Sequence, residues 1–244
     1  METINLQVPN SWTDLDERQL LYVFTIIACE YPSDTIKTFA LMRWNNIEVL
    51  DPVGNHEYLI KRDKDKIVVS SVRIAELIQS MNWITEVPNS PVHLASIKGH
   101  DALPADFQEV PFEKFIMCDN LYQGYLHIQN PELLDELLCL LYNINEPTGF
   151  TKAQQVNAFY WWAALKKHLA SIFRFFFTQS DGEYPALGKN LYDTLSRSMN
   201  NQIRALTKGD ITKEKEVLAM DTWRALTELD AQVKDYEDMR SKSK

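Results

Sequence analysis

Cysteine and histidine are the side chains of this sequence with the greatest capacity for nucleophilic or metal chemistry. The three cysteines, Cys29, Cys118 and Cys139, lie far apart, and none belongs to a C-x-x-C pair. Zinc sites depend on such pairs or on an H-E-x-x-H helix, and the sequence contains neither. We therefore predict no metal centre and no bound cofactor. The five histidines are His56, His93, His100, His127 and His168.

One cysteine has polar neighbours of the kind found in thiol catalytic centres. Asp119 follows Cys118 directly, and His127 comes nine residues later. A nucleophile, its base and its orienting group must meet in space, which spacing alone does not establish. A buried cysteine beside surface polar residues is the preferred interpretation. Cys29 and Cys139 lie in apolar helical patterns and are also expected to be buried.

Phosphate loops and acid–base pairs are not indicated either. Only seven glycines occur, and neither G-x-x-x-x-G-K nor G-x-G-x-x-G is present. The carboxylates of Glu132, Asp135 and Glu136 share one region of a helix, where paired acids could transfer protons. Negative charge is favoured near a helix N-terminus, so a solvated face is the better interpretation. No catalytic residue is assigned.

The composition is typical of a folded globular protein with an acidic surface. Of the 244 residues, 45% are hydrophobic and 11% aromatic, which is enough to form a core. The formal net charge of −9 disfavours nucleic acid as a partner, because duplex binders cluster lysine and arginine. The sparse, odd cysteine count, the absence of a signal-peptide pattern and the lack of a long apolar run predict a cytoplasmic protein without membrane contact.

The elements expected before residue 86 combine helices with the clearest β pattern of the chain. Alternation predicts strands, and apolar positions three and four residues apart predict helices. We expect strands at 3–8 and 47–50, helices at 15–30, 33–44 and 72–83, and a hairpin formed by 57–62 and 66–70.

The first two of these helices form a pair joined by a tight turn, which is also the outline of a helix-turn-helix DNA binder. The second would then be the recognition helix. It offers only Lys37 and Arg43 as long basic side chains, so a DNA-binding regulator is an alternative function and not the preferred one.

Irregular and helical segments alternate in the middle of the chain. Residues 86–111 contain several prolines and could be a surface connection or a loop that carries a dispersed enzyme site. Helices are expected at 112–128 and from Pro131 onward. The run from Asn145 to Gly149 is the best boundary, which predicts an α+β domain at 1–145 and a helical domain at 150–244. The fold class is therefore mainly α with a small N-terminal β element.

The helical domain is expected to contain three long helices, at 152–178, 185–208 and 211–240. The first includes the aromatic stretch around Trp161 and Trp162, which is apolar on nearly all sides. Such a helix is usually buried, and contact with a partner is the second interpretation. The last carries an apolar stripe on a charged helix, to be covered by this chain or by another copy. The stripe consists of Val217, Met220, Trp223, Leu226, Leu229 and Val233.

Several segments carry a resemblance to other sequences. The C-terminal runs 203–216 and 223–229, the opening residues 9–12 and 20–22, and the middle run 119–125 resemble uncharacterised proteins encoded in phages and prophages of gut Bacteroidota. The resemblance implies phage genetics and a virion or tail-assembly role, with the virion as a second location. It supplies no catalytic residue.

These observations predict a non-enzymatic structural or assembly protein that acts through contacts with other protein chains, including self-association. The side chains expected to make those contacts are Trp161, Trp162 and the six residues of the C-terminal stripe. An enzyme with a site near 86–111 and the DNA-binding regulator are the alternatives.

Overall fold

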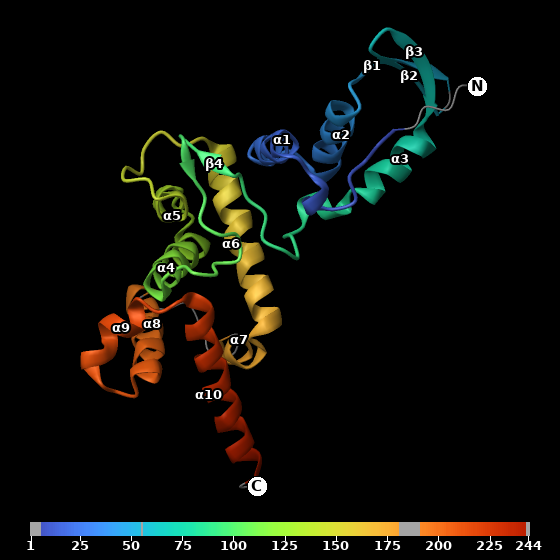
Figure 1. Ribbon diagram of the computed structural model, residues 1–244. Coiled ribbons are helices and arrows are strands. Elements are labelled where there is room, and N and C mark those ends of the chain that lie inside the picture. Colours follow the sequence, from blue (N-terminus) through green and yellow to red (C-terminus); the bar gives the residue numbers. More distant parts are fainter. Residues whose placement is uncertain (1–5, 55, 181–190, 243–244) are drawn as a thin grey trace. The chain divides into compact units, whose positions relative to one another are not determined.

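A computed structural model describes residues 6–54, 56–180 and 191–242, and it is mainly helical with a small sheet near the N-terminus, as predicted (Figure 1). The chain forms two compact units. Unit 1 comprises Met1–Pro88 and Thr151–Asn157, and unit 2 comprises Asn89–Phe150 and Ala158–Lys244.

Unit 1 contains the sheet, with α2 in contact with β1 and α3 in contact with β3. Strands β1, β2 and β3 form an antiparallel meander in that order. The predicted hairpin forms from β2 and β3, and the strand predicted at 47–50 forms as β1 but continues to Gly54. No strand forms at residues 6–8, and the rest of the strand predicted at 3–8 falls outside the described residues. The elements are η1 (Trp12–Asp14), α1 (Glu17–Ile27), α2 (Ser33–Trp44), β1 (Ile47–Gly54), β2 (Glu57–Arg62), β3 (Asp65–Ser70), α3 (Ser71–Ser80) and η2 (Asn82–Thr85).

One aliphatic cluster and one aromatic cluster stabilise unit 1. Leu41 of α2 and Leu77 of α3 meet in an aliphatic cluster with Met81, and Trp44 packs against it. Trp12 donates its indole N–H to the main-chain oxygens of Trp83 and Glu86, at 2.9 and 3.1 Å. Burial of these side chains fixes how α2, α3 and η2 pack together.

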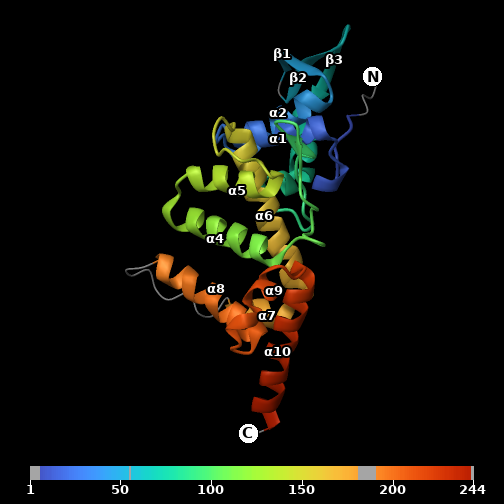
Figure 2. The same ribbon diagram turned by 60° about the vertical axis from the view of Figure 1, so that its left-hand side comes forward.

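Unit 2 is built from helices and one short hairpin. The α4–α5 pair lies side by side in both views (Figure 2). Residues on both sides of the predicted boundary at 145–149 belong to unit 2, where α8, α9 and α10 all contact α4. The elements are β4 (Ser96–Ile97), β5 (His100–Asp101), α4 (Phe112–Ile128), α5 (Glu132–Tyr142), most of α6 (Lys152–Ile172), α7 (Arg174–Ser180), α8 (Leu191–Thr207), η3 (Ile211–Lys213), α9 (Glu214–Leu218) and α10 (Thr222–Lys242).

The helix predicted at 152–178 is interrupted at Phe173, between α6 and α7. A continuous helix would direct the amide of Phe176 to the carbonyl of Ile172. That amide instead donates to Oδ1 of Asp230, a residue of α10, at 2.9 Å. The prediction of one helix was wrong because α10 packs against α7 and supplies this acceptor.

The helix predicted at 211–240 is also interrupted, at residues 219–221. Asp221 directly precedes α10 and caps its N-terminus, since its carboxylate accepts the amide of Arg224 at 2.9 Å. The same carboxylate accepts the amide of Glu109 at 2.6 Å. The helix predicted at 185–208 corresponds to α8, which is described from Leu191, and residues 185–190 fall outside the described part.

Candidate functional site

The aromatic stretch of α6 lies in the interior of unit 2. Trp161 and Trp162 are both fully buried. Their indole N–H groups donate to the carbonyl of Ala105 at 2.9 Å and to Oδ1 of Asp119 at 3.2 Å. Their burial agrees with the first interpretation of this helix, that it is buried within its own chain. Contact of these two residues with a partner stays a prediction.

The C-terminal stripe is not one continuous surface. Val217 belongs to α9 and is buried, whereas Met220 lies in the break and is half-buried. Within α10, Leu226 and Leu229 are buried and Val233 is half-buried. The stripe is therefore covered largely within unit 2, which leaves little of it for another copy.

Trp223, the remaining member of the stripe, is half-buried and anchored to the main chain. Its indole N–H donates to the carbonyl of Asp106 at 2.7 Å, and its ring meets the Phe173 ring edge-on with centroids 5.6 Å apart. Trp161 and Trp223 thus donate to the carbonyls of two adjacent residues, Ala105 and Asp106.

An enzyme site near residues 86–111 was the alternative prediction. The part of that segment in unit 2, the connection at 89–111, supplies main-chain hydrogen-bond acceptors to side chains of α5, α6 and α10. The Tyr142 hydroxyl donates to the carbonyl of Leu94, and the Thr222 hydroxyl donates to the carbonyl of Val110, at 2.8 and 2.7 Å. Phe107 is fully buried among the α4 and α6 aromatics. Burial of polar main chain requires such partners, so this connection has a structural role.

The thiol nucleophile considered for Cys118 does not fit its surroundings. The side chain is fully buried, and this burial holds the thiol pKa far above its ordinary value, although Lys114 partly opposes the shift. Neighbouring Asp119 is engaged by Lys166, whose Nζ lies 2.8 Å from Oδ1. A protonated, inaccessible thiol does not act as a nucleophile.

The second helix of unit 1 does not present a basic recognition surface. Lys37 is buried, and its Nζ donates to Oδ1 of Asn82 at 2.7 Å and to Asp34 at 3.2 Å. Arg43 is exposed, with its guanidinium carbon 5.8 Å from the centre of the Tyr22 ring. The two basic side chains on which DNA reading would depend therefore make contacts within unit 1.

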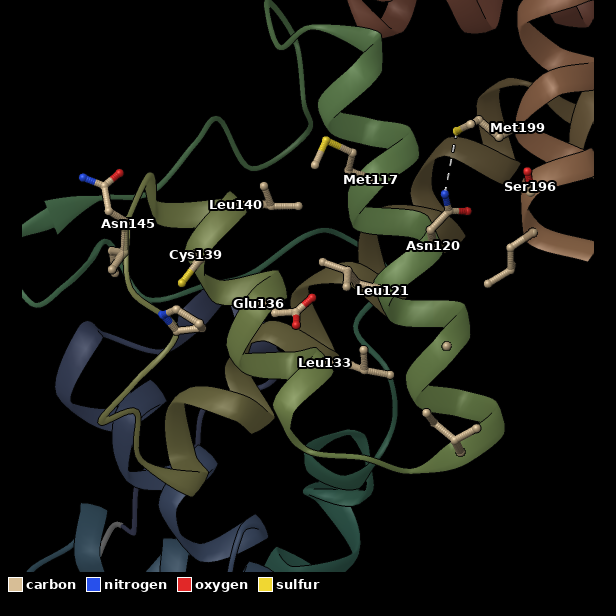
Figure 3. Close-up of a pocket in the computed structure, with 15 residues that line it drawn as sticks. Met117, Asn120, Leu121, Leu133, Glu136, Cys139, Leu140, Asn145, Ser196 and Met199 are labelled. Atoms are coloured by element: carbon tan, nitrogen blue, oxygen red, sulfur yellow. Dashed lines mark hydrogen bonds between the residues drawn. The ribbon is translucent and has the colours of Figure 1, made fainter. Parts of the chain in front are cut away.

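An apolar groove of about 770 Å³ lies between α4, α5 and α8 (Figure 3). The side chains of Met117, Leu121, Leu133 and Leu140 lie between the ribbons of α4 and α5 in that view. Three segments and the loop after α5 form its lining, which comprises Met117, Asn120, Leu121, Gly124, Ile128, Leu133, Glu136, Cys139, Leu140, Ile144, Asn145, Pro147, Leu195, Ser196 and Met199.

The groove exists because α5 is apolar on two faces. One face packs into the core through Leu134, Leu137 and Leu138, which are all buried. The other face carries Leu133 and Leu140, which are only half-buried. This doubly apolar pattern, LLDELLCLLY, was the signal in the sequence that could have indicated an uncovered helix face.

A glycine sets how closely the two helices approach. A Cβ atom at Gly124 of α4 would lie 3.2 Å from Cδ1 of Leu133, closer than ordinary van der Waals contact. The missing side chain therefore lets α5 lie close to α4 at the Leu133 end of the groove.

The lining has few polar groups. The amide of Asn120 contacts the Met199 sulfur at 4.0 Å, and Glu136 is exposed. Burial raises the pKa of the Cys139 thiol, with Lys98 opposing the shift and the carboxylates of Asp135 and Glu136 adding to it. A mostly apolar lining with a single carboxylate suits an apolar ligand surface better than a reaction.

Comparison with known proteins adds no assignment, since no family model, curated protein or solved structure matches the chain. Among the described residues, no three histidine, cysteine or acidic side chains gather as metal ligands do. None of the helices in the described ranges has the length and apolar character to cross a membrane.

Proposed function

We propose that this protein is a non-enzymatic interaction protein that binds an apolar helical segment of another protein in the groove between α4, α5 and α8. The groove itself is the observation that supports the proposal. It leaves Met117 and Ile128 exposed by 46% and 61%, on the same helix. Covering apolar surface yields about 25 cal/mol per Å², so a partner helix in the groove would bind favourably.

The shape of the groove favours a helix over a compact substrate. Its walls are themselves helices, and α4 and α5 run beside each other along it (Figures 2 and 3). Methionines on α4 and α8 give the walls flexible side chains that can adjust to a partner's surface. A helix laid between them would complete a local bundle. The phage resemblance suggests particle assembly as the setting for such contacts.

Titration of a labelled helical peptide, with leucines on one face and glutamines on the other, tests the proposal. A peptide of about 18 residues is about 27 Å long and carries no net side-chain charge. We expect saturable binding at one site per chain, measured by fluorescence anisotropy. Met117→Gln should weaken it by about tenfold, since the substitution places an amide in the apolar groove.

The chain offers a matched control on the same helix. Leu126 of α4 is 45% exposed but lies outside the groove lining, so Leu126→Gln changes polarity at equal exposure. This variant should bind the peptide as the unaltered chain does. Equal weakening by Met117→Gln and Leu126→Gln, or no saturable binding to the unaltered chain, would contradict the proposed function.

A further inference from the structure

We infer that the helix that binds in the groove is basic, with lysine or arginine beside its apolar face; the inference rests on the proposed function. It follows from the juxtaposition of the apolar lining with carboxylates along the α5 side of the groove. Glu136 is part of the lining, and Glu132 precedes it by one helical turn on the same face of α5. Glu146 lies in the following loop, between the lining residues Asn145 and Pro147.

These carboxylates are available to a partner. Glu132, Glu136 and Glu146 are all exposed. In the part of the chain that the structure describes, none of the three forms an ion pair, although Glu132 accepts a hydrogen bond from the Asn130 amide at 3.2 Å. Glu132 and Glu136 also repel each other as like charges four residues apart. A cation from a partner helix would offset that repulsion.

Lysines of the same region are directed to other groups. Lys114 donates to Oδ1 of Asn143 at 2.6 Å. Lys98 donates to the carbonyl of Thr148, and its Nζ lies 4.0 Å from the centre of the Phe150 ring. Both lysines therefore contact the segment that follows α5, and within the described part of the chain neither forms an ion pair with the carboxylates of the α5 edge.

The opposite wall of the groove differs in charge. The α8 residues in the lining, Leu195, Ser196 and Met199, are neutral. A bound helix would therefore meet carboxylates along one side of its apolar face and uncharged groups along the other. Such an arrangement selects partners by the sign of their charge and accelerates their association, and the net charge of −9 acts in the same direction.

Two charged versions of the helical peptide test the inference with the full chain. One has lysines in place of the glutamines beside the leucine face, and the other has glutamates there. We expect the lysine peptide to bind at least about tenfold more tightly than the glutamate peptide. The double variant Glu132→Lys with Glu136→Lys should reverse this preference, and its circular dichroism melting curve would establish that it folds.

A matched double variant separates a local effect from the overall charge. Glu237 and Asp238 are exposed residues of α10 outside the groove lining. Glu237→Lys with Asp238→Lys changes the net charge by the same amount, and it should leave the preference for the lysine peptide within about twofold.

Three other outcomes of these binding measurements would overturn either the basic-helix inference or the proposed function. Equal binding of both charged peptides, with weakening by Met117→Gln, would overturn the basic-helix inference and leave the proposed function standing. An equal loss of preference in the α5 and α10 double variants would show attraction to net charge only, and would also overturn the inference. Failure of the lysine, glutamate and glutamine peptides alike to bind would overturn the proposed function itself.

Discussion

The two units each contain three of the six tryptophans, but they satisfy the indole N–H groups differently. In unit 2, the indoles of Trp161, Trp162 and Trp223 all donate hydrogen bonds. In unit 1, Trp12 donates to two carbonyls, whereas the buried Nε1 atoms of Trp44 and Trp83 have no acceptor among the described residues. The rings of these last two stack, with centroids 6.5 Å apart and planes within 5°.

This difference shows two ways of ordering a tryptophan cluster. In unit 2, hydrogen bonds to two main-chain carbonyls and one carboxylate hold the three rings in defined positions. Ring stacking and apolar burial hold the cluster of unit 1, and each buried donor without an acceptor costs about 1–3 kcal/mol. We therefore expect unit 2 to depend strongly on the identity of its tryptophans, and unit 1 to accept aromatic replacements more readily.

The largest expected effect comes from truncating a tryptophan of unit 2. Trp161→Ala should lower the free energy of unfolding by about 3–5 kcal/mol, since it leaves a cavity and removes the donor to the Ala105 carbonyl. Urea unfolding followed by circular dichroism measures this loss. A loss below 1 kcal/mol would mean that the ring is not held in the core.

Replacing single tryptophans by phenylalanine isolates the hydrogen bond. Trp161→Phe and Trp83→Phe remove the same atoms, but only the first removes a formed hydrogen bond. Trp161→Phe should therefore be the more destabilising of the two, by about 1–3 kcal/mol in urea unfolding. Equal losses would refute the proposed difference between the clusters.

The labelling rates of the three cysteines report how accessible each thiol is to solvent in the two units. Cys118 is buried as predicted, whereas the predicted burial of the other two was wrong, since Cys29 of unit 1 is exposed and Cys139 is half-buried in the groove. Iodoacetamide labelling followed by mass spectrometry should modify Cys29 at least about tenfold faster than Cys139, and leave native Cys118 unmodified, because the thiolate is the reactive form.

The pH dependence of this labelling has a defined sign. Burial raises the pKa of Cys139, so less of its thiol is ionised at a given pH than for an ordinary cysteine. Its labelling rate should keep increasing as pH rises above the ordinary thiol pKa of about 8.5. A rate that levels off below that pH would contradict the raised pKa.

The smallest effect concerns one cation–aromatic contact in each unit. Lys98 of unit 2 lies 4.0 Å from the Phe150 ring centre, and Arg43 of unit 1 lies 5.8 Å from that of Tyr22. Lys98→Met should lower stability by up to about 1 kcal/mol, and Arg43→Met by less, as measured by differential scanning calorimetry. A larger loss of stability for Arg43→Met than for Lys98→Met would show that the distance from the cation to the ring centre does not determine the strength of these contacts.

Local patterns were sufficient to predict most elements. The helix at 112–128 and the hairpin strand at 57–62 have the predicted bounds, because apolar periodicity and turn residues determine them locally. The breaks at Phe173 and near Asp221 were missed, since both depend on acceptors or donors distant in sequence. Aspartate at 221 was nevertheless a readable N-cap signal.

The candidate site was less predictable than the fold. The apolar stripe at 217–233 indicated a surface that needs cover, but the sequence could not show that the chain itself covers most of it. The groove arises from α4, α5 and α8 together, so no single helix reveals it. Only the second apolar face of α5 and the small residue at Gly124 were signals present in the sequence.

The hydrogen bonds between the 89–111 connection and α10 also bear on how the protein is synthesised. The Thr222 hydroxyl and the Val110 carbonyl are separated by 112 residues in sequence, and the Trp223 indole and the Asp106 carbonyl by 117. At 5–20 residues per second, a ribosome takes about 6–22 s to make the intervening chain. During that interval the carbonyls of Val110 and Asp106 have been synthesised but their donors in α10 have not. The aromatic core of unit 2 is therefore incomplete and accessible to chaperones.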